Sequence, residues 1–307
     1  MKKNESYSVF LEMVANCVRD VYKGEVIVEN NVFTKNNGVQ VQGLMLRKKE
    51  EKIAPNFYLD KQYEEWKKGT LSLYDIVTHI CNTFEIEVQT NQQLADKICF
   101  EWDEMKKDVF PRLINRDKNK ELLEKIPYIE FMDLAVVYFY SIHISEDVQG
   151  TVVLTKEHLK LLGITKEQLH QTAQENVKMQ YPMKLYQMGN LIATVGKKLG
   201  ITGLESYTND DFMYIFSNES TMFGAIAMFF EDELKKVAER LNCNFYVLPS
   251  SVHEVILVPE NTYLTISVEN FLSMVKDINA TQVKETEVLS DSVYYYDRAI
   301  EKIRRVG

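Results

Sequence analysis

Residues 250–254 place two hydroxyls, an imidazole and a carboxylate close together, from Ser250, Ser251, His253 and Glu254. A serine hydrolase needs a serine nucleophile, a base that takes its proton and an acid that orients the base. If residues 252–258 form a strand, His253 and Glu254 point to opposite faces, so Glu254 cannot orient His253. Ser251 and His253 would share a face, with roughly 6–7 Å between their Cβ atoms. The four residues are candidates for catalysis; the competing interpretation is a hairpin turn whose serines cap backbone groups.

Other reactive patterns are incomplete. The sequence HEVIL begins like a zinc-protease helix, but Leu257 stands where the second histidine must be. Neither glycine-rich phosphate-loop pattern occurs, and the four cysteines form no CxxC pair. The acidic run 231–233 falls inside a predicted helix, where it is expected to form a solvated face. We therefore expect no metal site and no cofactor.

The stretch 221–258 contains the elements that must position these residues. Its apolar side chains recur at helical spacing: Phe230, Leu234, Val237, Ala238 and Leu241. This spacing predicts an amphipathic helix that begins near Ser220 or Thr221 and ends at Asn242. Residues 212–216, 244–248 and 252–258 are rich in β-branched and aromatic side chains, which is typical of strands. The last two surround a Pro-Ser-Ser turn, so a hairpin is predicted to follow the strand and the helix.

Elsewhere, helical periods alternate with hairpin patterns. The sequence predicts an α+β fold, with a mixed sheet, hairpins, flanking amphipathic helices and the C-terminal strand–helix–hairpin unit. The 307 residues fit a single unit over 1–307. The length also allows two lobes, 1–128 and 129–307, with the weakest point at 115–129.

Composition excludes several classes of function. The net charge of −9 argues against nucleic-acid binding, which usually needs a basic face. No apolar run reaches 18 residues, so no membrane span is expected. The N-terminal residues MKKNESYS lack the apolar region of a signal peptide. We expect a soluble, cytoplasmic protein.

Seven stretches carry a resemblance to a known family: PNFYLD at 55–60, RLIN at 112–115, DLAVVY at 133–138, ENV at 175–177, FGA at 223–225, LPSSVHE at 248–254 and EVLSDSVYYYD at 287–297. On these stretches the chain resembles a family of uncharacterised proteins from clostridial gut bacteria, described only as a domain of unknown function. The resemblance spans nearly the whole chain and implies one full-length unit. It implies no reaction, cofactor or catalytic residue.

Two functional hypotheses follow. The first is a non-enzymatic binding or regulatory module with another protein as its partner, because no catalytic signature is complete and aromatic residues are plentiful. The alternative is a hydrolase-like enzyme centred on Ser251 and His253. A nucleic-acid protein would need a continuous basic patch that the sequence does not predict. The oligomeric state is left open.

Overall fold

The computed structural model describes residues 6–49, 54–97, 100–143, 149–201, 203, 212–249, 251–260 and 266–307. Helices are combined with antiparallel sheets, which confirms the predicted α+β fold class. The chain divides into two compact units, residues 1–99 with 142–150 and residues 100–141 with 151–307. Among the described helices, none is long and apolar enough to cross a membrane.

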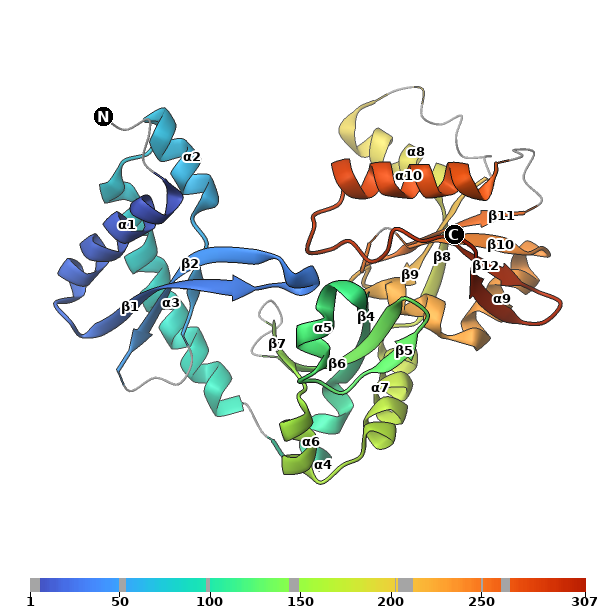
Figure 1. The fold of residues 1–307 in the computed structure, drawn as a ribbon, viewed down its shortest axis with the longest axis horizontal. Helices are drawn as coiled ribbons and strands as arrows, with labels where there is room; N and C mark the ends of the chain where they lie inside the picture. Colours follow the sequence, from blue (N-terminus) through green and yellow to red (C-terminus); the bar gives the residue numbers. More distant parts are fainter. Residues whose placement is uncertain are drawn as a thin grey trace. The chain divides into compact units, whose positions relative to one another are not determined.

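In its described residues, the first unit combines three helices with a three-stranded antiparallel sheet (Figure 1). Its elements are α1 (Tyr7–Tyr22), β1 (Val26–Thr34), β2 (Gln40–Lys48), β3 (Asn56–Phe57), α2 (Asp60–Lys68) and α3 (Leu73–Lys97), with a 3-10 turn at Asn36–Gly38. Phe10, Val14 and Val18 recur at helical spacing on α1, and they are buried in one core with side chains of β2 and α3. This core is made within the unit.

The second unit begins with a four-stranded sheet in which β4 and β5 both pair antiparallel with β6, and β7 also pairs with β6. Its strands are β4 (Val109–Asn115), β5 (Ile129–Phe131), β6 (Leu134–His143) and β7 (Gln149–Val153). The helices that accompany them are α4 (Trp102–Met105), α5 (Lys120–Leu123), α6 (Lys156–Leu162) and α7 (Lys166–Gln180), with 3-10 turns at Lys106–Asp108 and Asp117–Asn119. β4 is an edge strand, a position that tolerates the missing N–H of Pro111.

A six-stranded sheet follows in the order β13-β12-β10-β11-β9-β8, and every described neighbouring pair is antiparallel. Its strands are β8 (Met183–Gln187), β9 (Tyr214–Asn218), β10 (Phe245–Leu248), β11 (Val255–Pro259), β12 (Tyr294–Asp297) and β13 (Lys302–Arg305). Its helices are α8 (Met188–Leu199), α9 (Glu231–Leu241) and α10 (Val268–Thr281). α10 covers one face of this sheet, packing Phe271 and Val275 against Leu248 and Val258 (Figure 1).

The predicted strand–helix–hairpin unit corresponds to β9, α9, β10 and β11. β9 and β10 both run antiparallel to β11, which lies between them, so they are parallel to each other. The predicted end of the helix at Asn242 is confirmed, because this residue adopts the left-handed conformation with φ of 55°. β11 begins at Val255 instead of residue 252, so residues 251–254 are not part of the strand.

The predicted start of that helix was wrong. Ser220 and Thr221 do not cap it, because the chain turns at Phe223 with φ of 54° and then forms a separate 3-10 helix, Gly224–Phe229. α9 starts only at Glu231. The polar side chain of Asn218 stabilises this turn by donating to the Met222 carbonyl (2.8 Å) and accepting from the Met222 N–H (3.2 Å). Local hydrogen bonding of this kind competes with a helix.

The compact units divide the chain at residues 99 and 100, whereas the sequence placed the weakest point at 115–129. Residues 115–129 instead connect β4 to β5, and both of these strands pair with β6. The segment is therefore a connection within one sheet.

Candidate functional site

Several stretches that carry the family resemblance meet in the second unit. The side-chain amide of Asn115 donates to the Leu289 carbonyl (3.0 Å). Three backbone bonds join the other stretches: Ala225 N–H to the Val252 carbonyl (3.3 Å), Val252 N–H to the Glu287 carbonyl (2.9 Å) and Ser290 N–H to the Pro249 carbonyl (3.1 Å). Segments that are more than a hundred residues apart in the sequence thus surround the catalytic candidates.

The catalytic candidates are held by backbone groups. The buried hydroxyl of Ser251 accepts a hydrogen bond from the backbone N–H of His253 at 3.0 Å. The imidazole of His253 accepts at Nδ1 from the backbone N–H of Phe223 at 3.2 Å. A neutral ring that accepts at Nδ1 carries its proton on Nε2. Ser250 lies outside the described residues.

The hydrolase hypothesis needs the imidazole to take a proton from the serine hydroxyl. In the described residues, Ser251 and His253 instead bond through the His253 backbone N–H, and the ring faces Phe223 at 5.2 Å between ring centres. His253 therefore acts here as a positioning residue for Phe223. The hydrolase hypothesis stays a prediction, without a serine–imidazole bond in the described residues to support it.

Glu254 is only partly exposed. Burial raises the pKa of its carboxyl above the usual range, and the nearby charge of Glu287 adds to this effect. The electrostatic interaction with the neighbouring His253 and a hydrogen bond with Ser251 lower this pKa but do not cancel the increase. The ionised carboxylate of Glu254 is therefore disfavoured in the folded protein.

Glu254→Gln is expected to raise the melting temperature at pH 7. Because the folded-state pKa of Glu254 is raised, stability falls as the pH rises from the unfolded-state pKa through the folded-state pKa, and it stays lower above that range. The neutral amide of the variant avoids this loss of stability. The difference in melting temperature between the variant and wild type should therefore vanish in acid, where wild-type Glu254 is protonated. Thermal unfolding at both pH values tests this. A variant less stable than wild type at pH 7 would contradict it, and the exposed Glu121→Gln serves as control.

Sequence reasoning missed a more distinctive residue, Arg112 on β4. Its guanidinium carbon lies 3.9 Å from the ring centre of Phe139 and 3.6 Å from that of Phe223. Phe139 is on β6, diagonally across from Arg112, because Arg112 pairs with Val137 in the strand register. Phe223 reaches the guanidinium because its backbone turns there and its N–H is held by His253. The available signal was a charged residue flanked by the apolar residues Pro111 and Leu113 in the strand VFPRLIN.

The charge of Arg112 has no acidic partner in the described part of the chain. Burial lowers the pKa of its guanidinium to about 10, so the group is still protonated at neutral pH, and Tyr181 is the neighbour that acts in the opposite direction. Two aromatic faces attract the cation. The two rings, however, provide no oxygen that could accept hydrogen bonds from the guanidinium N–H groups. A guanidinium typically binds a carboxylate or a phosphate through two parallel hydrogen bonds. The arrangement is suited to an anionic group from outside the chain.

The acidic run on α9 has a different role. Each of its carboxylates forms an ion pair with a lysine: Glu231 with Lys302 (2.6 Å), Asp232 with Lys178 (2.7 Å) and Glu233 with Lys236 (2.6 Å). No group of three or more histidine, cysteine or acidic side chains within the described ranges is placed to hold a metal ion. These ion pairs agree with the predicted solvated face.

A family model described as "Family of unknown function (DUF5688)" matches residues 7–298. The chain belongs to this family. The DUF5688 match spans both compact units and includes Arg112, Phe223 and His253. No curated protein and no solved structure matches the chain. The description of the DUF5688 family assigns no activity to these residues, so their function is inferred from geometry.

Proposed function

We propose that the protein is a non-enzymatic binding module whose partner is another protein, and that Arg112 binds a carboxylate of that partner. The observation that carries this proposal is the guanidinium of Arg112, which lies over two aromatic rings without an acidic partner among the described residues. A cation in this state is costly to bury, and an incoming carboxylate would offset the cost.

The surroundings of Arg112 support a protein partner. Met222, adjacent to Phe223, is 55% exposed, and Tyr181 lies against Phe110 on the same strand as Arg112. Arginine, methionine and aromatic side chains are enriched at protein interfaces, and arginine, tyrosine and tryptophan are common among the residues that dominate the binding energy. The side chains around Arg112 combine these types.

The Nε–H signal of Arg112 in nitrogen-15 NMR spectra is expected to shift saturably when acetate is titrated at constant ionic strength. Acetate is the simplest probe for a carboxylate, and inorganic phosphate tests whether the site discriminates between the two anions. Arg116 is the matched control, because its guanidinium is already paired with Glu130 at 3.3 Å. The saturable shift of the Arg112 signal should be kept in Arg116→Gln.

Two outcomes would overturn this proposal. If the signals of Arg112 and Arg116 respond alike, or neither saturates, Arg112 is not an anion site. If the protein hydrolyses p-nitrophenyl acetate and Ser251→Ala abolishes the turnover, the hydrolase alternative replaces the non-enzymatic function.

A further inference from the structure

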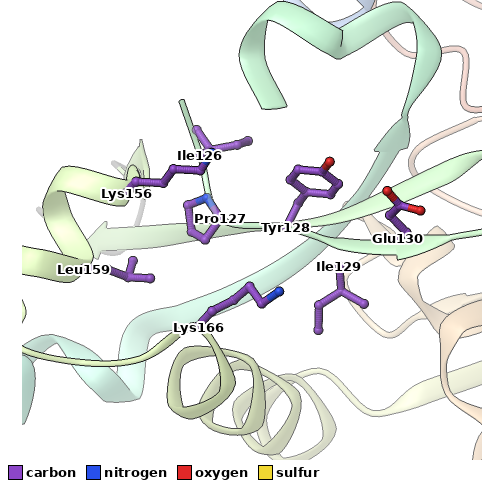
Figure 2. Close-up of a pocket in the computed structure, with 8 residues that line it drawn as sticks. All are labelled: Ile126, Pro127, Tyr128, Ile129, Glu130, Lys156, Leu159 and Lys166. Carbon is purple, nitrogen blue, oxygen red and sulfur yellow. The ribbon is translucent and has the colours of Figure 1, made fainter. Parts of the chain in front are cut away.

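A cavity of about 520 Å³ lies between residues 126–130 and the first turns of α6 and α7. Figure 2 shows its eight lining residues, with Lys156, Leu159 and Lys166 on one side and the segment that leads into β5 on the other. Small-molecule sites commonly have volumes of roughly 300–1,000 Å³. The cavity belongs to the second unit and shares no lining residue with the Arg112 site.

The walls of the cavity are mainly apolar. Ile126 and Leu159 are buried, with 1% and 8% of their surfaces exposed, and Pro127 is also buried. Ile129 and the ring of Tyr128 complete the lining. Such walls accept an aromatic or branched apolar body, since that body leaves water on binding.

The charges at the rim are not balanced. Glu130 is the acidic side chain among the lining residues, and its charge is compensated by an ion pair with Arg116 at 3.3 Å. The ammonium of Lys156 donates to the Glu124 carbonyl at 2.6 Å, and a carbonyl does not neutralise its charge. Lys166 has no ion pair in the described part of the chain, and Figure 2 shows its ammonium directed toward the segment that contains Tyr128 and Ile129. The rim is therefore positive.

The position of Lys166 in its helix adds to this charge. Lys166 is the first residue of α7, a helix of 15 residues that Thr165 caps by accepting from Gln168 N–H. The aligned peptide dipoles place the positive end of the helix there, where acidic side chains are favoured over basic ones. A ligand anion next to Lys166 would interact favourably with both the ammonium and the helix end.

We propose that this cavity binds a small organic anion. Its apolar body packs against Ile126, Pro127 and Leu159, and its carboxylate or sulfonate binds Lys166. This inference is independent of the Arg112 site, since the two sites are formed by different residues.

A fluorescence titration of the full-length protein with 8-anilinonaphthalene-1-sulfonate tests the proposal, because the probe combines an aromatic body with a sulfonate. Saturable binding is expected, with the dissociation constant raised roughly fivefold or more in Lys166→Glu. Lys160→Glu is the matched control. It makes the same charge change at an exposed residue of α6, and Lys160 does not line the cavity. It should change the constant less than about twofold. The uncharged probe N-phenyl-1-naphthylamine should bind Lys166→Glu and wild type alike.

Three results would overturn the proposal. Equal effects of Lys166→Glu and Lys160→Glu would mean that only the overall charge matters. Loss of sulfonate binding in Arg112→Gln would place the probe at the other site. If binding of the sulfonate probe persists unchanged in Ile129→Trp, which narrows the cavity, the probe does not occupy it. Circular dichroism melting of each variant identifies any loss that comes from unfolding.

Discussion

Asp133→Ala is expected to lower the free energy of unfolding by roughly 3–5 kcal/mol, because it leaves three buried hydroxyls without their acceptor. Asp133 lies in the turn between β5 and β6 and is 9% exposed. Its Oδ2 accepts from Ser290 at 2.6 Å and from Ser292 at 3.0 Å, and its Oδ1 accepts from the Tyr294 hydroxyl at 2.6 Å. The carboxylate thereby links the four-stranded sheet by hydrogen bonds to residues 290–294, which lead into β12.

The same contacts give this effect a pH dependence. Burial on its own would raise the pKa of Asp133, but hydrogen bonds from Ser290, Tyr294 and Ser292, and from its own backbone, hold it below the usual range. The stabilisation is therefore present above the ordinary aspartate pKa and is lost as the pH falls through the lower folded-state pKa. Urea unfolding of wild type and Asp133→Ala should show a difference in free energy that is largest near neutral pH and narrows in acid.

Two variants separate the loss of the acceptor from other causes. Asp133→Asn should cost less than the alanine variant, because an amide keeps one acceptor oxygen and hydroxyls can also accept. Glu130→Ala removes an exposed carboxylate from the same hairpin and should cost less than about 1 kcal/mol. If Asp133→Ala were no more destabilising than Glu130→Ala, the buried hydroxyl cluster would contribute nothing measurable.

The parts of the fold predicted correctly are those that local patterns determine. Leu234, Val237 and Ala238 recur at helical spacing, and all three are buried along α9. The runs at 244–248 and 252–258 were predicted to form a hairpin, and β10 and β11 do pair as one, although β11 begins only at Val255. The 3-10 helix was missed because Phe223, Ile226 and Ala227 continue the same spacing. Its conformation depends on tertiary contacts, including the bond from Ala225 N–H to the Val252 carbonyl.

The site was less predictable than the fold for a related reason. Ser251, His253 and Glu254 are neighbours in the chain, so their chemical types alone suggested catalysis. Arg112 and Phe223 are far apart in the sequence, and Asp133 is 157 residues from Ser290, so no spacing rule brings them together. The sequence offered only a weak sign of each, a charged residue inside or next to an apolar strand. Pairing across sheets, which determines the contacts of such residues, is not encoded in local periodicity.

Gly224→Ala is expected to cost roughly 3 kcal/mol or more, because the glycine lies where three atoms leave no room for a side chain. An added Cβ would lie 2.5 Å from the backbone nitrogen of Asn218 and 2.8 Å from the carbonyl oxygen of His253, and it would also meet the Ser217 hydroxyl. Two of these atoms belong to the backbone and cannot rotate away. Chemical denaturation measures the decrease in the free energy of unfolding. Adding Ser217→Ala to the Gly224→Ala variant should restore only part of that free energy.

Gly163→Ala separates crowding from backbone strain. Gly163 has φ of +66° with nothing within 4 Å of an added Cβ, so its alanine variant should cost only about 1 kcal/mol, from the left-handed conformation. Gly224 also connects stability to the proposed function, because it follows Phe223, whose ring lies over Arg112. At a temperature where both variants are folded, Gly224→Ala should weaken acetate binding at Arg112, and Gly163→Ala should not. Normal binding by folded Gly224→Ala would mean that the close packing at residue 224 does not position Phe223.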